Sequence, residues 1–299
     1  MRQTDIPQKQ TYPLRDGTIS ALHFGRVENP LKLVFLHANG FNAMAYRQIF
    51  SALGIHAVAL DMRGHGFTRL PTDIAALDSF HIFADDVVEF FNRYVKAPVV
   101  LAGHSFGGVA GILAAPQLTG QINGYVGFDP VSLTWLARTA LSSRIGRNYA
   151  KRRFSLARNA ARRKAVFTSP DEAFERYQNR GAFRGVPDQI LRDYLAGGLE
   201  LREDGAYHLC CPPLWEQAVF VAQNHNLYKA APALPDNSHI IYAGKFSNVS
   251  TPATRSLVQK KQPKIQVTYD KDIAHLFPLQ NPELAVQALK QTLTKAALG

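Results

Sequence analysis

One short stretch, VVLAGHSFGGVAGILAA at residues 99–115, strongly constrains the fold. An apolar run typical of a buried strand changes within a few residues into a helical pattern of small residues. The turn between them is Gly103-His104-Ser105-Phe106-Gly107. A turn this tight strains the backbone of its central residue and needs small neighbours, and it places the Ser105 hydroxyl beside the positive end of a helix. The stretch therefore predicts a strand–turn–helix unit that carries a serine nucleophile, with His104 as a packing residue.

Short apolar runs rich in β-branched residues recur along the chain, at residues 32–37, 56–61, 98–103, 124–129, 239–244 and 265–270. Such runs are typical of strands that are buried on both faces of a parallel sheet. Helical patterns lie between them, at about 43–53, 79–95, 106–116 and 282–298. TYPLRDGTISALHF, residues 11–24, alternates around Asp16-Gly17 and indicates a hairpin. The order of these elements predicts an α/β fold with a doubly wound, mostly parallel sheet.

The alternation of strands and helices stops after residue 131. For about a hundred residues the pattern is helical, basic and aromatic, and strands resume only near residue 239. We expect a core in two parts, residues 1–131 and 237–299. Between them we expect an inserted helical cap, residues 132–236, which is called the cap below.

The net charge of +11 is concentrated in one part of the cap. Residues 138–164 contain ten Lys or Arg and no Asp or Glu, which leaves about +1 for the rest of the chain. A basic balance confined to one segment does not indicate a nucleic-acid-binding protein.

Leu141, Ile145 and Tyr149 recur at helical spacing within this basic segment. The simplest interpretation is an amphipathic helix that covers a catalytic cleft and keeps its arginines in water. The alternative is that the segment approaches an anionic surface, either a lipid interface or an acidic substrate. Large residues along the cap are candidates for lining an apolar acyl pocket, although core packing is the simpler role for each of them: Phe167, Phe174, Tyr177, Phe183, Tyr194, Leu214, Trp215, Phe220 and Tyr228.

The sequence also bears on the compartment. No run of about eighteen apolar residues is free of charge, so a membrane-spanning helix is not expected. The N-terminal MRQTDIPQKQ lacks the apolar centre of a secretory signal. Cys210 and Cys211, the two cysteines, are adjacent, and reduced thiols are usual in the cytoplasm. We therefore expect a cytoplasmic protein.

The stretch around Ser105 resembles the nucleophile turn of the α/β-hydrolase family, and three further motifs extend the resemblance over nearly the whole chain. VFLHANGFNAMAYR, residues 34–47, looks like the loop after the third strand, which provides one oxyanion-hole N–H. DMRGHGFTR, residues 61–69, is similar to a structural signature after the fourth strand. DIAHLFPLQNPE, residues 272–283, resembles the C-terminal loop in which the catalytic histidine, here His275, precedes the last helix.

The resemblance implies a role for each matched residue. His275 would take the proton from Ser105 and return it to the leaving group, because a neutral serine is a poor nucleophile. The backbone N–H groups of Asn39 and Phe106 would hold the oxyanion. Ala38 stands where the family usually has glycine, which predicts a slightly different loop backbone. A serine at this turn argues against dehalogenase or epoxide-hydrolase chemistry, for which relatives use aspartate.

A histidine base needs a third group that fixes its tautomer and stabilises the imidazolium. The family usually places a carboxylate after the strand at 239–244, where this sequence has KFSNVS and no acid. Some members take the acid from the neighbouring strand end, which points to Asp129. Asn248 is the second candidate, because its amide oxygen would orient the ring without supplying charge. The remaining candidates are less favourably placed in the chain: Asp236, Asp270 and Asp272.

These features together predict a serine hydrolase of the carboxylesterase or lipase type, which cleaves esters with an apolar acyl part through an acyl-enzyme on Ser105. No cofactor or metal is expected, since no His, Asp or Cys cluster has ligand spacing. Thioesterase, C–C bond hydrolase and perhydrolase chemistry stay open, because the same residues support all three. A non-catalytic ligand-binding protein on a hydrolase scaffold is the alternative of a different class. The missing acid after residue 244 favours it, while Ser105 and His275 oppose it.

Overall fold

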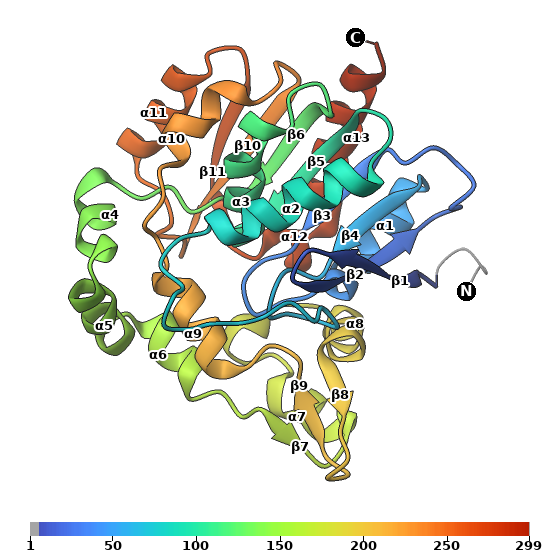
Figure 1. Cartoon of the computed structure of the whole chain (residues 1–299), viewed down its shortest axis with the longest axis vertical. Helices are drawn as coiled ribbons and strands as arrows, with labels where there is room; N and C mark the ends of the chain where they lie inside the picture. The colour runs from blue at the N-terminus through green and yellow to red at the C-terminus, as the bar shows by residue number, and fades with distance from the viewer. Residues whose placement is uncertain (1–5, 299) are drawn as a thin grey trace.

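The computed structural model describes residues 6–298. At its centre lies an eight-stranded sheet with the strand order β1-β2-β4-β3-β5-β6-β10-β11 (Figure 1). β1 and β2 form the expected hairpin and β2 is antiparallel to β4, whereas the remaining pairs are parallel. The doubly wound, mostly parallel sheet predicted from the sequence is confirmed. Its strands are Gln8–Leu14 (β1), Gly17–Phe24 (β2), Leu33–Leu36 (β3), Ala57–Leu60 (β4), Val99–His104 (β5), Ile122–Phe128 (β6), Ser238–Lys245 (β10) and Gln266–Ala274 (β11).

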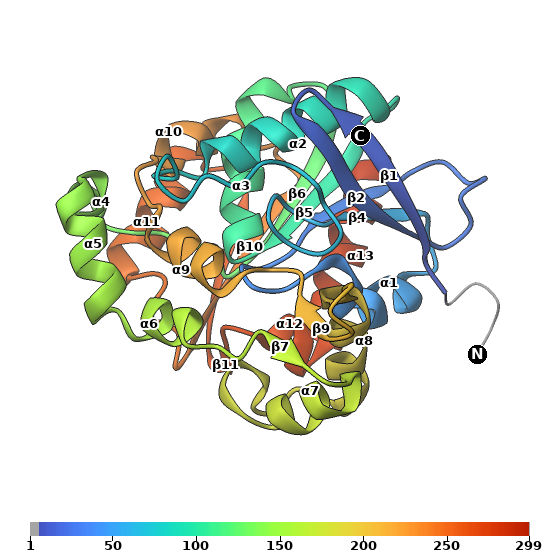
Figure 2. The same ribbon diagram turned by 60° about the horizontal axis from the view of Figure 1, so that its bottom comes forward.

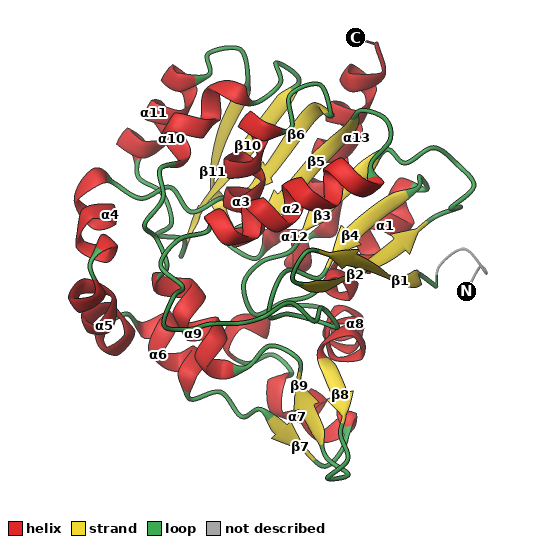
Figure 3. Ribbon diagram, viewed as in Figure 1, coloured by secondary structure: helices red, strands yellow, loops and turns green. Residues whose placement is uncertain are grey.

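Helices cover both faces of this sheet (Figure 3). One face packs against His81–Tyr94 (α2), Phe106–Ala114 (α3), Leu227–Ala230 (α10) and Pro252–Lys261 (α11). The other packs against Arg47–Leu53 (α1), which follows a short 3₁₀ turn, and against Phe277–Gln280 (α12) and Pro282–Leu298 (α13).

Successive residues of the central strands point to opposite faces of the sheet. Val34 and Leu36 of β3 pack in the cluster with α2 and α3, while Leu33 and Phe35 pack in the cluster with α1 and α13. All four side chains are fully buried. A strand buried on both faces must be apolar at every position, which is why continuous apolar runs locate these strands in the sequence.

A long segment between β6 and β10 lies outside the large sheet (Figures 1 and 2). The predicted cap boundaries, 132 and 236, fall in the connections after β6 and before β10. Apart from α10, which packs on the core, its helices and strands are Trp135–Ser142 (α4), Arg144–Arg153 (α5), Ser155–Ala161 (α6), Val166–Phe167 (β7), Pro170–Tyr177 (α7), Asp188–Gly198 (α8), Leu199–Leu201 (β8), Tyr207–Leu209 (β9) and Pro213–Val221 (α9).

The cap differs from the sequence prediction in two ways. It contains a three-stranded antiparallel sheet, β7-β9-β8, whose strands of two or three residues are too short to give a periodic pattern. The predicted amphipathic helix is broken at Ser143, whose hydroxyl accepts the Gly146 N–H at 3.0 Å and caps α5. α4 and α5 contain no buried residue, and Ile145 and Tyr149 are 83% and 64% exposed. The interpretation of this stretch as a helix that covers the cleft with its apolar face is therefore wrong.

Three points concern the compartment prediction. Within residues 6–298, no helix has both the length and the apolar character needed to cross a membrane. Residues 1–5, half of the N-terminal stretch used in that prediction, lie outside the described residues. Cys210 and Cys211 are free thiols, and burial raises the pKa of Cys210 to about 12.

Candidate active site

The turn between β5 and α3 holds Ser105 at φ 53° and ψ −114°, a conformation that residues other than glycine rarely adopt. A Cβ at Gly103 would lie 2.6 Å from the Gly107 carbonyl, and a Cβ at Gly107 would lie 2.4 Å from the Leu36 carbonyl oxygen. Neither position accepts a larger residue. The Ser105 N–H donates to the Phe128 carbonyl at 2.8 Å, which ties the strained residue to β6. The strand, turn and helix expected from the sequence are all present.

His275 follows directly on the last residue of β11 and reaches both of its predicted partners. Its Nε2 lies 2.9 Å from the Ser105 hydroxyl oxygen, and its Nδ1 lies 2.7 Å from Oδ2 of Asp129. Because an ionised carboxylate only accepts, the assigned tautomer has its proton on Nδ1, which leaves Nε2 free to accept from serine. The histidine side chain is 27% exposed, whereas the Asp129 side chain is fully buried. The ends of three parallel strands thus bring the three residues together.

Asp129 is fixed by several hydrogen bonds at the end of β6. Its backbone has φ 44°, and its N–H donates to the Ile241 carbonyl at 2.7 Å. Besides His275, its carboxylate accepts the Ala243 N–H at 3.0 Å and the Ser247 hydroxyl at 2.6 Å. A carboxylate can be buried when its oxygens are hydrogen-bonded in this way.

Ser247 belongs to KFSNVS, the segment that lacks the usual acid, and was not among the site residues predicted from the sequence. Its signal was present: a hydroxyl residue stands beside the place where the family's carboxylate is usually found. With Asp129 at the end of β6 as the carboxylate beside His275, the Ser247 hydroxyl donates a hydrogen bond to it.

The other candidate acids lie away from the histidine. Asn248 is exposed and makes no side-chain hydrogen bond to His275. Asp270 and Asp272 are exposed on β11, where Asp270 accepts the N–H of Asp272 at 2.8 Å. Asp236 pairs with Lys264 at 2.8 Å, just before β10 and at the opposite end of that strand from Asp129. The structure brings only Asp129, among these five, to His275.

Asn39 and Phe106, the predicted oxyanion-hole residues, flank the serine from two segments. The Phe106 N–H is the first of α3, and the first N–H groups of a helix have no intrahelical acceptor. Asn39 lies in the loop after β3, and its side-chain amide donates to the Glu216 carbonyl of α9 at 3.0 Å. Within residues 6–298 neither backbone N–H has a protein acceptor. Both donors are available to a bound group.

A chain of hydrogen bonds joins the loop after β3 to the loop of His275. The Ala38 N–H donates to the Tyr46 hydroxyl at 3.1 Å, which lies 2.7 Å from Nδ1 of His104. Nε2 of His104 lies 2.8 Å from the His275 carbonyl oxygen. Since a carbonyl only accepts, Nε2 of His104 carries the proton and the Tyr46 hydroxyl donates to Nδ1. His104 is therefore a polar bridge, not the packing residue that the sequence analysis expected.

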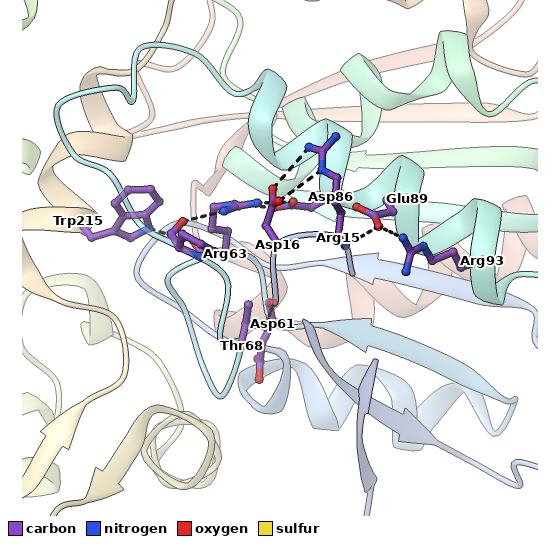
Figure 4. Close-up of polar contacts among 10 residues, drawn as sticks. Arg15, Asp16, Asp61, Arg63, Thr68, Asp86, Glu89, Arg93 and Trp215 are labelled. Carbon is purple, nitrogen blue, oxygen red and sulfur yellow. Dashed lines mark hydrogen bonds and ion pairs between the residues drawn. The ribbon is translucent and has the colours of Figure 1, made fainter. Parts of the chain in front are cut away.

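The loop after β4, with the DMRGHG motif, has a structural role. Arg63 donates two hydrogen bonds to Asp86 of α2, at 2.9 and 2.7 Å, and both side chains are buried (Figure 4). The Arg63 carbonyl accepts the indole N–H of Trp215 in α9 at 3.1 Å. Nε2 of His65 accepts the Gly40 N–H at 3.0 Å. The loop thus connects α2, the cap and the loop after β3, a structural role.

Arg163 holds the cap helices against one another next to this loop. Its guanidinium, on a side chain that is 14% exposed, pairs with Glu216 of α9 at 2.9 Å and donates to the hydroxyls of Tyr177 and Tyr194. Because the Glu216 backbone carbonyl accepts from the Asn39 side chain, these contacts reach the loop after β3. Most of the large cap residues considered for an acyl pocket are buried, namely Phe167, Phe174, Tyr177, Phe183, Tyr194, Trp215 and Tyr228, whereas Leu214 is exposed. In the described part of the chain, no three His, Cys, Asp or Glu side chains gather as a metal site requires.

Six histidines make the fold sensitive to acid. Burial lowers the pKa of His23, His65 and His239 to about 4 and that of His225 to about 3, and it lowers the pKa of His37 and His104 well below the ordinary value. In the unfolded chain these groups protonate near pH 6.5, so below that pH the unfolded state binds more protons than the folded state. Each histidine then costs about 1.4 kcal/mol per pH unit, down to its folded pKa. Asp61 and Asp86 oppose this trend, since burial raises the pKa of Asp61 to about 6 and also raises the pKa of Asp86.

We therefore expect the free energy of unfolding to fall by several kcal/mol between pH 7 and pH 5, since the six histidines outweigh the two carboxyl groups. Urea denaturation followed by far-ultraviolet circular dichroism measures the change. From pH 7 to pH 8 the same histidines are neutral in both states and should contribute almost nothing. A free energy that stays constant or rises on acidification would contradict the burial of neutral histidines.

The chain matches the family model described as "Alpha/beta hydrolase family" over residues 33–288. It is 37% identical to human Protein ABHD8 over 78 residues, 25% of this chain and 18% of that protein. It is 34% identical to mouse Protein phosphatase methylesterase 1 over 123 residues, 39% of this chain and 31% of that protein. It is 30% identical to human Monoglyceride lipase over 112 residues, 35% of this chain and 36% of that protein.

The matched segments thus span well under half of each curated relative. Among solved structures, E-2-(Acetamidomethylene)succinate Hydrolase superposes with a TM-score of 0.77 at 18% identity, covering 96% of this chain and 99% of that one. A likeness at this identity shows the fold.

Proposed function

The chain belongs to the alpha/beta hydrolase family, and on that premise we propose that it is a serine hydrolase that cleaves carboxylic esters with an apolar acyl part. The hydrogen bonds that run from the Ser105 hydroxyl through His275 to Asp129 carry this proposal. Such an arrangement removes the serine proton and stabilises the resulting imidazolium. Two relatives named as a methylesterase and a monoglyceride lipase support the choice of esters.

In the proposed acylation, Nε2 of His275 takes the proton from Ser105 as the hydroxyl oxygen attacks the ester carbonyl carbon. The backbone N–H groups of Asn39 and Phe106 hold the oxyanion that forms, each stabilising it by about 3 kcal/mol. Collapse of this intermediate breaks the bond to the alcohol oxygen. The alcohol leaves with the proton from His275, and the acyl group stays on Ser105.

Deacylation repeats these steps with water in place of the alcohol. His275 takes a proton from water as its oxygen attacks the acyl carbon, and the same two N–H groups hold the second oxyanion. The bond to Ser105 then breaks, the serine oxygen regains its proton, and the carboxylic acid leaves. Throughout, Asp129 keeps the proton of the histidine on Nδ1 and stabilises the imidazolium.

The substrate class is tested with a series of p-nitrophenyl esters of increasing acyl length and the thioesters of the same acids. We expect the wild type to hydrolyse the esters far faster than the His275→Ala variant, with kcat/KM rising as the acyl chain lengthens. Thioesters turned over faster than esters of equal length would move the assignment to a thioesterase. A wild type no faster than His275→Ala on every substrate would contradict the proposal.

Ser247→Ala is expected to lower kcat about tenfold, because it removes one of the three hydrogen bonds that hold the Asp129 carboxylate. Ser250→Ala is the matched control: Ser250 lies on the same loop, but its hydroxyl accepts from Arg255 at 3.1 Å instead of contacting Asp129. Steady-state ester hydrolysis by both variants makes the comparison. Equal rates for the two would show that the Ser247 contact does not position the acid.

A further inference from the structure

Three short helices of the cap, α4 to α6, expose large apolar side chains, and α6 buries only Ala157 and Ala160. α4 and α5 have no buried residue, and both lie on the outer margin of the molecule in two views (Figures 1 and 2). The exposed fractions are large: Trp135 66%, Leu136 71%, Ile145 83%, Tyr149 64%, Phe154 44% and Leu156 49%. Apolar exposure gathered in one segment marks an interaction surface.

The same helices carry most of the uncompensated charge of the chain. Of the ten cations between residues 138 and 164, Arg163 and Lys164 pair with carboxylates of the cap. The other eight have no carboxylate within ion-pair distance among residues 6–298. The pKa of Lys151 is lowered by partial burial and by the neighbouring positive charges of Arg147 and Arg144, which shows how close these cations lie to one another. The surface is therefore strongly positive as well as apolar.

α5 combines the two properties in the arrangement of a helix that lies flat on a bilayer. Ile145 and Tyr149 are about one turn apart on a common exposed face, and Arg152 and Arg153 flank that face on its two sides. The Arg153 guanidinium lies 5.8 Å from the centre of the Tyr149 ring. Such a helix places its apolar side chains at the boundary between headgroups and acyl chains, while its cations contact lipid phosphates.

We propose that α4 to α6 dock the cap on the surface of an anionic lipid bilayer, with Leu136, Ile145 and Tyr149 in the headgroup region and Arg152 and Arg153 on lipid phosphates. Charge complementarity selects this occupant. A nucleic acid would match the arginines but would offer little to Leu136 and Ile145. A second copy of the chain would bring two positive surfaces together.

This surface is close in the fold to the candidate active site. α6 packs on α9, and α9 carries Trp215 and Glu216, which contact the loops around Asn39 and Arg63. Docking would therefore hold the cap side of the site next to the membrane. That docking would give the site access to esters dissolved in the bilayer rests on the proposed function. The docking itself does not rest on it.

Sedimentation with vesicles tests the proposal. The vesicles contain phosphatidylcholine alone or with about 30 mol % phosphatidylserine, in about 0.1 M and about 0.5 M NaCl. We expect binding to the anionic vesicles only, weakened at least tenfold by the higher salt. Arg152→Gln/Arg153→Gln should bind roughly 20-fold more weakly and Ile145→Ser/Tyr149→Ser at least about tenfold more weakly.

The matched controls exchange exposed residues elsewhere, in Lys260→Gln/Lys261→Gln on α11 and Leu201→Ser/Leu298→Ser. Both should bind within about twofold of the wild type. No binding by the wild type, or equal losses in controls and surface variants, would overturn the proposal. The proposal would also be overturned if the protein bound a single-stranded RNA but no vesicles, and if Ile145→Ser/Tyr149→Ser left that RNA binding unchanged. Because the assay needs no turnover, its failure is distinct from a failure of the hydrolase proposal.

Discussion

Ser105→Ala is expected to lower kcat for ester hydrolysis by about 10⁶-fold, the largest effect of any single change in this chain. The variant removes the atom that is acylated, so His275 and the oxyanion donors are left without a covalent step to assist. A small residual rate above the uncatalysed reaction should persist, because Asn39 and Phe106 still stabilise attack by water. Steady-state kinetics on the p-nitrophenyl ester with the highest kcat/KM measures the loss.

The control for this variant is its folding stability. The Ser105 hydroxyl makes one hydrogen bond, to a partly exposed histidine, and alanine keeps the same backbone at φ 53°. We expect the free energy of unfolding to change by no more than about 1 kcal/mol. A folded variant that keeps more than a tenth of the wild-type kcat would show that Ser105 is not the nucleophile.

Asp129→Asn is expected to lower kcat about 10⁴-fold while the fold is retained. Asparagine has nearly the same shape but only one acceptor oxygen, whereas donors from His275, Ala243 and Ser247 converge on this carboxylate. An amide N–H would therefore face Nδ1 of the histidine and move its proton to Nε2. In that tautomer His275 cannot accept the serine proton, and no charge remains to stabilise an imidazolium.

Asn248→Ala is the matched comparison for the acid, and its kcat should stay within about twofold of the wild type, because the side chain is exposed and does not contact His275. Urea denaturation of both variants separates a loss of catalysis from a loss of folding. If Asn248→Ala lost activity while Asp129→Asn kept most of it, the assignment of the acid to β6 would be wrong.

Much of the core could be predicted because burial and steric exclusion each leave a mark on neighbouring residues in the sequence. The residues of β3 pack into two clusters on opposite faces, so its sequence is apolar throughout. The turn at Ser105 excludes side chains at Gly103 and Gly107, so its glycines are visible as a motif. Because KFSNVS contains no acid, the sequence pointed to the neighbouring strand end, where Asp129 now lies 2.7 Å from His275.

The parts that were not predicted depend on contacts between distant residues or on very short elements. His104 acts as a bridge only because Tyr46 and the His275 carbonyl lie at its two nitrogens, and His275 is 171 positions away. Ser247 contacts the site only through its hydrogen bond to Asp129, which a sequence pattern does not reveal. In the cap, strands of two or three residues leave no periodicity. The helical spacing of Leu141, Ile145 and Tyr149 in the cap predicted one continuous helix. In the structure, α4 ends at Ser142 and a new helix begins after the Ser143 cap.

Labelling with a fluorophosphonate, followed by mass spectrometry of the digested protein, tests the central claim most directly. The probe phosphonylates a serine only when a neighbouring base activates it, and it does not depend on knowing the natural ester. We predict one adduct per chain, on the peptide that contains Ser105, and its loss in His275→Ala. A folded wild type that remains unlabelled, or is labelled on a different residue, would contradict the claim that Ser105, His275 and Asp129 form a working catalytic site.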